Sequence, residues 1–215
     1  MPQIKGILFD NDGTLLDTYE LILESFNYAY EEVLGHTFPP EEVMQKVGQP
    51  LETQVRDFAD DDEVVAEVVR VYRDLNVRIH DERATVYEGC IETLAALKDA
   101  GIRMCIVTSK RHSLAQHGIE VFGIAPYMEF LLGSDDWPAH KPDPSVVLRG
   151  CELLGLDPAE CAYVGDSPFD MQAANGAGCF SVAALWGMFD RETLEAENPD
   201  ALCETFADLP AVLAL

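Results

Sequence analysis

The sequence predicts an α/β fold in which a doubly wound, mostly parallel five-stranded sheet carries an inserted all-α domain. Three observations lead to this prediction. Five short runs are continuously apolar, as strands buried on both faces of a parallel sheet are. Helical patterns lie between the last four runs, which is the alternation typical of doubly wound sheets. After the first run, by contrast, residues 17–82 show helical patterns and no strand signal.

Strands and helices of the predicted sheet domain alternate along the chain. The five strands are expected at residues 4–9, 104–108, 130–133, 162–165 and 180–185. One helix is predicted where apolar residues recur at helical spacing before a terminating glycine, at Ile91, Leu94, Ala95, Leu97 and Gly101. The same pattern predicts a second helix from Val146, Val147, Cys151, Leu154 and Gly155.

The inserted segment contains two apolar stripes at helical spacing. The first stripe consists of Ile22, Phe26, Ala29 and Val33, with Gly35 after it. The second consists of Val64, Val65, Val68, Tyr72, Leu75 and Ile79. Between them, the chain is broken by Pro39, Pro40, Gly48 and Pro50. We therefore predict a sheet domain over residues 1–16 and 83–215, and a helical domain over residues 17–82.

Composition excludes several classes of partner. The 215 residues carry a net charge of −25, which would repel nucleic acid and anionic membranes. No apolar stretch approaches the ~20 residues needed to span a bilayer, and the N-terminus has no signal-peptide pattern. The six cysteines form no C-x-x-C pair, which favours a reducing compartment. We expect a cytoplasmic protein, either a monomer or a homodimer.

Two acidic residues directly follow the first predicted strand. Asp10 and Asp12 flank Asn11, and Gly13 allows the chain to turn sharply. In open α/β sheets, ligands bind at this end of the strands. One carboxylate could attack phosphorus while the other transfers the proton. The alternative is that the aspartates only cap a turn.

Two further groups follow later strands. Thr108 and Ser109 come after the second strand, where a hydroxyl and backbone N–H groups could hold phosphate; an ordinary helix cap is the alternative. Lys141, between His140 and Pro142, could neutralise phosphate oxygens at the same edge. Alternatively, Lys141 is a solvated surface residue. His112, His117 and His140 have no partner at metal-binding spacing, and we expect them to be structural or exposed.

A second acidic pair follows the fourth predicted strand. Asp166 and Asp170 would join Asp10 and Asp12 at the edge of the sheet. Four carboxylates gathered there would repel one another unless a cation lay among them. Because the ligands are all oxygens, the pattern favours Mg²⁺.

These four groups, in this order, resemble the motifs of the haloacid dehalogenase superfamily of phosphohydrolases. Residues 10–15 resemble its Asp-x-Asp-Gly-Thr-Leu motif, and residues 165–170 its Gly-Asp-x-x-x-Asp motif. Thr108 and Lys141 match its two remaining motifs. The resemblance covers essentially the whole chain, because the helical segment 17–82 lies where one subgroup has a cap domain. The phosphoglycolate phosphatase-like and pyrophosphatase-like subgroup is the most similar.

The resemblance implies a role for each residue. Asp10 would be the nucleophile that forms an aspartyl-phosphate, and Asp12 the acid and base. Mg²⁺ would be held by Asp10, the backbone carbonyl of Asp12 and Asp166, with Asp170 ordering a metal-bound water. The phosphoryl oxygens would be bound by Thr108, Lys141 and backbone N–H groups near Asn11 and Ser109. The expected substrate is a small phosphorylated metabolite, either a phosphoglycolate-like phosphomonoester or pyrophosphate.

Other functions of the same fold are less consistent with these residues. True dehalogenases and phosphonate hydrolases of the superfamily lack the second aspartate, whereas Asp12 is present; Lys46 would otherwise be a candidate imine-forming lysine. Sugar-phosphate mutases carry basic residues early in the cap, and residues 18–23 contain none. A catalytically silent binding module would be expected to have lost one of the motif residues.

The helical domain is expected to select the substrate. The segment 46–51 contains Gly48 and Pro50 and is predicted to form a loop facing the sheet domain. A small anionic substrate would need a positive group there, and Lys46 and Arg56 are the candidates.

Overall fold

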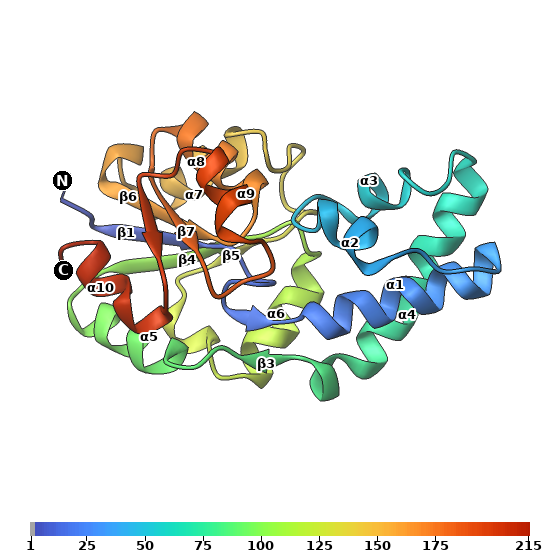
Figure 1. The fold of residues 1–215 in the computed structure, drawn as a ribbon. Coiled ribbons are helices and arrows are strands. Elements are labelled where there is room, and N and C mark those ends of the chain that lie inside the picture. Colours follow the sequence, from blue (N-terminus) through green and yellow to red (C-terminus); the bar gives the residue numbers. More distant parts are fainter. Residues whose placement is uncertain (1–2) are drawn as a thin grey trace.

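The computed structural model describes residues 3–215 and shows an α/β domain beside a helical segment (Figure 1). Within these residues, six strands form one sheet in the order β5-β4-β1-β6-β7-β8, and every neighbouring pair is parallel. The strands are β1 (Gly6–Phe9), β4 (Arg103–Val107), β5 (Leu131–Leu132), β6 (Cys161–Gly165), β7 (Phe180–Ala184) and β8 (Ala201–Cys203). The doubly wound, parallel fold predicted from the sequence is confirmed.

The sheet has one strand more than the five predicted. The sixth strand, β8, spans only three residues and lies at the edge of the sheet, paired with β7. Its three residues follow directly after Asn198, Pro199 and Asp200, and so short a run beside turn-forming residues gives little strand signal. The other five strands lie where they were expected, within a residue or two at their ends.

Helices cover both faces of the sheet (Figure 1). On one face, α5 (Cys90–Asp99), α6 (His112–Val121) and α10 (Leu209–Val212) pack on a core that contains Phe9, Ile106 and Val164. On the other, α7 (Ser145–Leu154) and α8 (Pro168–Ala177) pack on Leu8 and Tyr163. A smaller cluster joins α9 (Arg191–Ala196) to β7 and α8. Because both faces are covered, the strands are apolar along their whole length.

The inserted segment is helical and has its own core. It contains α1 (Tyr19–Leu34), α2 (Pro40–Val43), α3 (Leu51–Val55) and α4 (Asp62–Arg83). Phe26 and Tyr30 stack in this core, and Tyr30 also contacts Phe38 and Phe58. A short antiparallel pair, β2 (Leu16–Asp17) with β3 (Thr85–Val86), forms where the chain leaves the sheet domain and returns. This second sheet was not predicted.

The loop between α2 and α3 reaches the sheet domain, as predicted. The hydroxyl of Ser109 donates a hydrogen bond of 2.6 Å to the carbonyl oxygen of Gly48. Gly48 has a φ of +105°, and a Cβ there would lie 2.8 Å from Oγ of Ser167. A glycine is therefore required both by the backbone conformation and by the close approach of the two parts. Among residues 3–215, none of the helices combines the length and the apolar character needed to cross a membrane.

Candidate active site

The candidate site lies where the three central strands end. Asp10 follows β1, Thr108 follows β4 and Asp166 follows β6, and β1 is hydrogen-bonded to both of the other strands. After β1 the chain builds the sheet first on one side, through β4 and β5, and then on the other, through β6 to β8. This change of direction leaves the crevice at the strand ends in which open α/β sheets bind ligands.

Lys141 joins two of the carboxylates by ion pairs. Its Nζ lies 2.9 Å from Oδ2 of Asp10 and 2.5 Å from Oδ1 of Asp170, and all three side chains are buried. Burial opposes the charged form of Lys141, but the attraction of Asp10 and Asp170 outweighs it and raises the pKa of Lys141. Lys141 is thus a fully charged, fixed cation at the edge of the sheet, not the solvated lysine that the sequence left possible.

The acidic cluster holds more negative than positive charge. Carboxylate oxygens of Asp10, Asp166 and Asp170 lie within 4.8 Å of one another, and Lys141 is the one cation paired with them in the described residues. Burial raises the pKa of Asp10 to about 7, since Lys141 only partly offsets it and Asp170 repels. Burial, Asp170 and Asp10 likewise raise the pKa of Asp166 well above its usual range. A divalent cation would relieve this repulsion.

Oxygen donors in this cluster fit Mg²⁺. Oδ1 of Asp10 is buried and has no hydrogen-bond partner among residues 3–215. A buried charged oxygen without a partner is costly, and it is therefore available as a metal ligand or a nucleophile. Its surroundings offer carboxylate and carbonyl oxygens, which are the donors that Mg²⁺ prefers.

Asp166 is held in place by backbone and hydroxyl groups. Oγ1 of Thr14 donates to its Oδ1 at 2.8 Å, and the backbone N–H of Met188 donates to its Oδ2 at 2.8 Å. Two glycines leave room for it: a Cβ at Gly13, where φ is +80°, would lie 2.1 Å from Oδ2 of Asp166, and one at Gly187 would lie 2.1 Å from its Cβ. The loop after β7 therefore closes over this carboxylate.

Asp170 has both of its oxygens occupied by protein groups. Oδ1 receives the ion pair from Lys141 and lies 3.2 Å from the hydroxyl of Tyr163. Oδ2 accepts hydrogen bonds from Oγ and the backbone N–H of Ser167, which closes a capping box at the start of α8. The arrangement suits a residue that orients Lys141. Asp170 also belongs to the acidic cluster with Asp10 and Asp166, and its predicted role in ordering a metal-bound water stays a prediction.

The carboxylate of Asp12 does not join the acidic cluster, although the sequence predicted that four carboxylates would converge. Its Oδ1 lies 2.9 Å from Nζ of Lys110, with both side chains largely buried. Nδ2 of Asn11 lies 3.3 Å from the same oxygen. The neighbouring cation Lys110 therefore offsets the charge of this carboxylate. Only the backbone carbonyl of Asp12 remains as a candidate metal ligand.

The predicted phosphate-binding residues lie beside the cluster. Asn11 and Thr108 are buried, and Oγ1 of Thr108 accepts a 3.2 Å hydrogen bond from the backbone N–H of Lys110. The Ser109 hydroxyl is bonded to Gly48 of the helical segment, as described above. Ser109 therefore offers its backbone N–H to a ligand, while its side chain holds the loop of the insertion.

A pocket between the two parts of the chain opens above these residues. Its floor includes Asp10, Asp12 and Thr108, and the helical segment contributes Gly48 and Tyr72 to its wall. Three cations line it, namely Lys110, Arg111 and Arg73.

Neither of the two predicted substrate-binding cations of the insertion lines this pocket within the described residues. Lys46 is half-exposed and pairs with Asp57, and Arg56 is exposed and pairs with Asp62. Arg73, on α4, is the cation of the helical segment that does line it, and it pairs with Glu52 at 2.7 Å. That a cation of this segment binds the substrate stays a prediction, and Arg73 is now the better candidate for it.

Comparison with known proteins identifies the family. Residues 7–184 match the family of haloacid dehalogenase-like hydrolases. The chain belongs to this family. It is 39% identical, over 98% of its length and 95% of the other protein, to a provisionally named pyrophosphatase PpaX of Caldanaerobacter subterraneus subsp. tengcongensis. It is 35% identical, over 96% and 95% of the two chains, to the pyrophosphatase PpaX of Bacillus velezensis.

A solved structure has a similar fold. It is described as a predicted phosphoglycolate phosphatase from Haemophilus somnus 129PT, with a TM-score of 0.90 and 28% identity over 99% of both chains. The superfamily resemblance drawn from the motifs is confirmed. These similarities support phosphatase activity for this haloacid dehalogenase-like hydrolase.

Several site residues of this haloacid dehalogenase-like hydrolase were missed by sequence reasoning. Lys110 follows the Thr108-Ser109 pair directly, and its position at a strand end was the signal that could have found it. Arg73 and Arg111 lie on or beside helices, where a single arginine is indistinguishable from a surface residue. The loop at Gly187 and Met188 acts through the backbone N–H of Met188, which any residue type except proline could supply.

Proposed function

We propose that this chain is a Mg²⁺-dependent phosphohydrolase that cleaves pyrophosphate through an aspartyl-phosphate on Asp10. The observation that carries the proposal is the buried carboxylate of Asp10. It has one oxygen paired with Lys141 at 2.9 Å and the other without a partner in the described residues. A nucleophile held in place by a fixed cation, at the floor of a pocket, is the arrangement that covalent phosphoryl transfer requires.

The residues divide the chemistry between them. An oxygen of Asp10 forms a bond to phosphorus while the bond to the leaving oxygen breaks, and the leaving group takes the electron pair. Asp12 gives a proton to that oxygen, then takes one from the water that attacks the phosphoryl group. This second step releases phosphate and restores the Asp10 carboxylate. Lys141 and Thr108 orient the phosphoryl oxygens and offset their charge.

The acidic cluster would hold the metal ion. Asp10, Asp166 and the backbone carbonyl of Asp12 are the proposed ligands of Mg²⁺, with the carboxylates supplying charge and hard oxygen donors. When bound, the ion would offset the negative charge of the transferred phosphoryl group. Asp170 is assigned a positioning role through Lys141, because both of its oxygens are already bonded to protein groups.

Two considerations favour pyrophosphate as the substrate over a phosphomonoester. The cations Lys110, Arg111 and Arg73 line the pocket above Asp10, and a second phosphate group would carry enough charge to engage them. Lys110, 2.9 Å from Asp12, lies beside the proposed acid and can offset the charge of the leaving phosphate. Several relatives named as pyrophosphatases agree with this choice.

The helical segment 17–82 is proposed to act as a cap over the site. It meets the sheet domain at Gly48, and two short crossings at β2 and β3 connect the two parts. Closure of such a cap would exclude bulk water from the aspartyl-phosphate. The cytoplasmic location, the absence of a nucleic-acid partner and the choice between monomer and homodimer stay predictions.

A turnover screen tests the proposed reaction. Pyrophosphate, phosphoglycolate, sugar phosphates and an aryl phosphate would be compared with Mg²⁺ present, with Asp10→Asn as the inactive control. We expect the highest kcat/KM for pyrophosphate and a loss of several orders of magnitude in the variant. Turnover close to wild type in Asp10→Asn would refute the covalent mechanism. Binding without turnover of any of the substrates would instead indicate a silent binding module.

A second experiment tests the pocket cations. Arg73→Ala and Lys110→Met should each raise KM or lower kcat/KM for pyrophosphate by about tenfold or more, because a charge-assisted contact to phosphate contributes about 1.5–3 kcal/mol. Hydrolysis of an aryl phosphate should change much less in Arg73→Ala. Lys46→Ala is the matched control, since Lys46 is a cation of the same segment outside the pocket. Equal losses on both substrates in Arg73→Ala would remove Arg73 from substrate recognition.

A further inference from the structure

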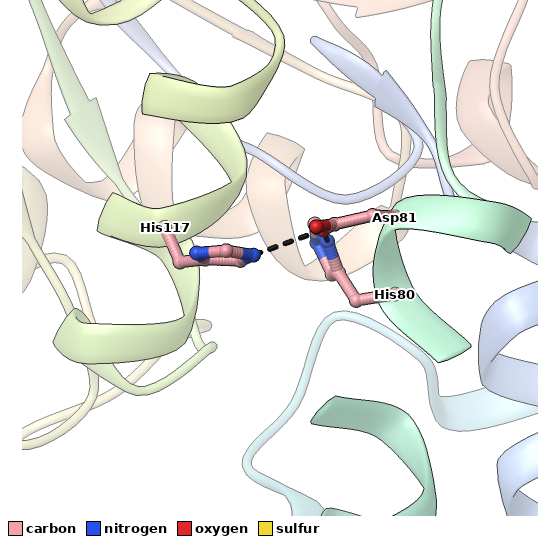
Figure 2. Close-up of side chains that lie close together, drawn as sticks. All are labelled: His80, Asp81 and His117. Atoms are coloured by element: carbon pink, nitrogen blue, oxygen red, sulfur yellow. Dashed lines mark hydrogen bonds and ion pairs between the residues drawn. The ribbon is translucent and has the colours of Figure 1, made fainter. Parts of the chain in front are cut away.

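A cluster of two histidines and one aspartate lies on the side of the molecule where the helical segment meets α6. His80 and Asp81 are in the last turn of α4, and His117 is on α6 of the sheet domain (Figure 2). The phosphatase chemistry proposed above uses none of the three. Nothing in the sequence connects the three, because His117 lies far along the chain from the other two.

Both histidine rings point at the same oxygen atom. Nδ1 of His80 lies 2.9 Å from Oδ1 of Asp81, and Nε2 of His117 lies 2.9 Å from that oxygen as well. One ligand atom from each residue can be chosen so that all three lie within 4.8 Å of one another. Figure 2 shows the imidazole of His117 directed across the gap between the helices toward Asp81. Separations of this size are those of neighbouring ligands around one small cation.

We propose that His80, Asp81 and His117 bind a divalent transition metal ion, such as Zn²⁺, between the helical segment and the sheet domain. Two imidazole nitrogens and one carboxylate oxygen are a ligand set that Zn²⁺ and its neighbours prefer. Mg²⁺ prefers oxygens alone and is better served by the Asp10 cluster. The two sites therefore differ in the class of metal they take.

The ring nitrogens of both histidines already face the carboxylate. Nδ1 of His80 and Nε2 of His117 donate to the same oxygen of Asp81, because a carboxylate oxygen only accepts hydrogen bonds. A bound metal ion would take the place of these protons, since metal binding to histidine releases protons. Nε2 of His80 is buried and has no hydrogen-bond partner in the described residues, so it could take up the proton that Nδ1 gives up.

A metal ion could reach the cluster from solvent. The side chains of Asp81 and His117 are 54% and 51% exposed, while His80 is buried behind them. Three protein ligands leave at least one coordination position for water. The strongly negative net charge of the chain, −25, also favours a cation over an anion.

Zinc binding in excess Mg²⁺ tests the proposal without measuring turnover, so its outcome is separate from that of the proposed function. Metal-free protein would be titrated with Zn²⁺ by calorimetry, with Mg²⁺ in excess to occupy the oxygen site. We expect one Zn²⁺ per chain in the wild type. His117→Gln and Asp81→Asn should each raise the Kd by about tenfold to a hundredfold or more, since even outer partners of a metal site contribute that much.

His36→Gln is the matched control, because His36 is an exposed histidine of the helical segment whose ring contacts the backbone carbonyl of Leu34 and the ring of Phe38, neither of which is a metal-binding side chain. It should bind Zn²⁺ as the wild type does. Circular dichroism in zinc-free buffer would verify that His117→Gln folds, as expected for an exposed side chain. With Co²⁺ in place of Zn²⁺, the visible spectrum should report nitrogen ligation in the wild type and lose it in His117→Gln. Unchanged affinity in His117→Gln, or no Zn²⁺ bound by the wild type, would show that the three residues form only a hydrogen-bond network.

Discussion

Replacing Asp10 by asparagine should abolish turnover and, without metal, make the protein more stable. The Asp10 carboxyl is buried, and its pKa is raised from 3.8 to about 7. A tenfold change in proton affinity corresponds to about 1.4 kcal/mol, so ionised Asp10 costs the folded state about 4 kcal/mol relative to the unfolded chain. Asparagine has nearly the shape of the protonated carboxyl and carries no charge. The variant avoids this cost.

The size of the effect depends on pH. Below about pH 4, Asp10 is protonated in both states, and wild type and variant should be equally stable. Between about pH 4 and 7 the folded state binds more protons at this group than the unfolded state, so the stability of the wild type falls as pH rises. Above about pH 7, the difference in unfolding free energy between the variant and the wild type reaches its full value of about 4 kcal/mol. For a chain of this length, about 4 kcal/mol corresponds to a Tm difference of about 10 °C.

Thermal unfolding at about pH 5 and pH 8, with chelator present, measures this difference. Asp12→Asn is the control, because the carboxylate of Asp12 pairs with Lys110 outside the acidic cluster; it should gain no stability at alkaline pH. Added Mg²⁺ should stabilise the wild type more than Asp10→Asn, since binding to the folded state alone raises Tm. Two outcomes would show that ionised Asp10 does not destabilise the folded state. In one, Asp10→Asn is no more stable than the wild type at pH 8; in the other, the gain in stability is the same at both pH values.

Four further outcomes are expected. Chelation should remove activity and Mg²⁺ restore it, whereas Ca²⁺ should bind and inhibit because its looser coordination can occupy both oxygens of Asp10; full activity after exhaustive chelation would contradict the metal site. Gly13→Ala should raise the Mg²⁺ concentration for half activity, because its Cβ would displace Asp166 and φ of +80° costs about 1–2 kcal/mol in alanine. Asp170→Asn should lower kcat about tenfold to a hundredfold by releasing Lys141, with Mg²⁺ affinity little changed; a large loss of Mg²⁺ affinity would make Asp170 part of the metal site. Finally, kcat/KM for pyrophosphate should rise with salt at low ionic strength, as screening reduces the repulsion of the acidic surface.

Sequence reasoning found the features that are encoded locally. Buried strands are continuous apolar runs, and the residues that follow them must lie at one edge of a parallel sheet. For that reason Asp10, Thr108 and Asp166 could be placed together before any coordinates were known. The role of Lys141 could be predicted only from the resemblance to the family, because a single lysine before a proline forms no recognisable pattern.

Features that depend on the direction of a side chain could not be predicted. Asp10 and Asp12 are two residues apart, yet one carboxylate enters the acidic cluster and the other turns to Lys110. The sequence shows both only as acids after a strand. Asp170 is a similar case, because its spacing from Asp166 suggested a metal-binding pair. Its spacing from Ser167 is equally that of a capping box, and in the structure Asp170 both closes that capping box and lies in the acidic cluster.

Charge at the site and charge on the surface of this chain act at different distances. The net charge of −25 acts over about a Debye length, ~8 Å at physiological salt, and repels the substrate. Inside the pocket, Lys110, Arg111 and Arg73 lie close to where the anion binds, and Lys141 is buried beneath it. Short-range contacts in a partly desolvated pocket outweigh a screened surface field. The acidic composition argues against a polyanionic partner, which would cover the surface, but not against a small phosphate compound that fits among the cations.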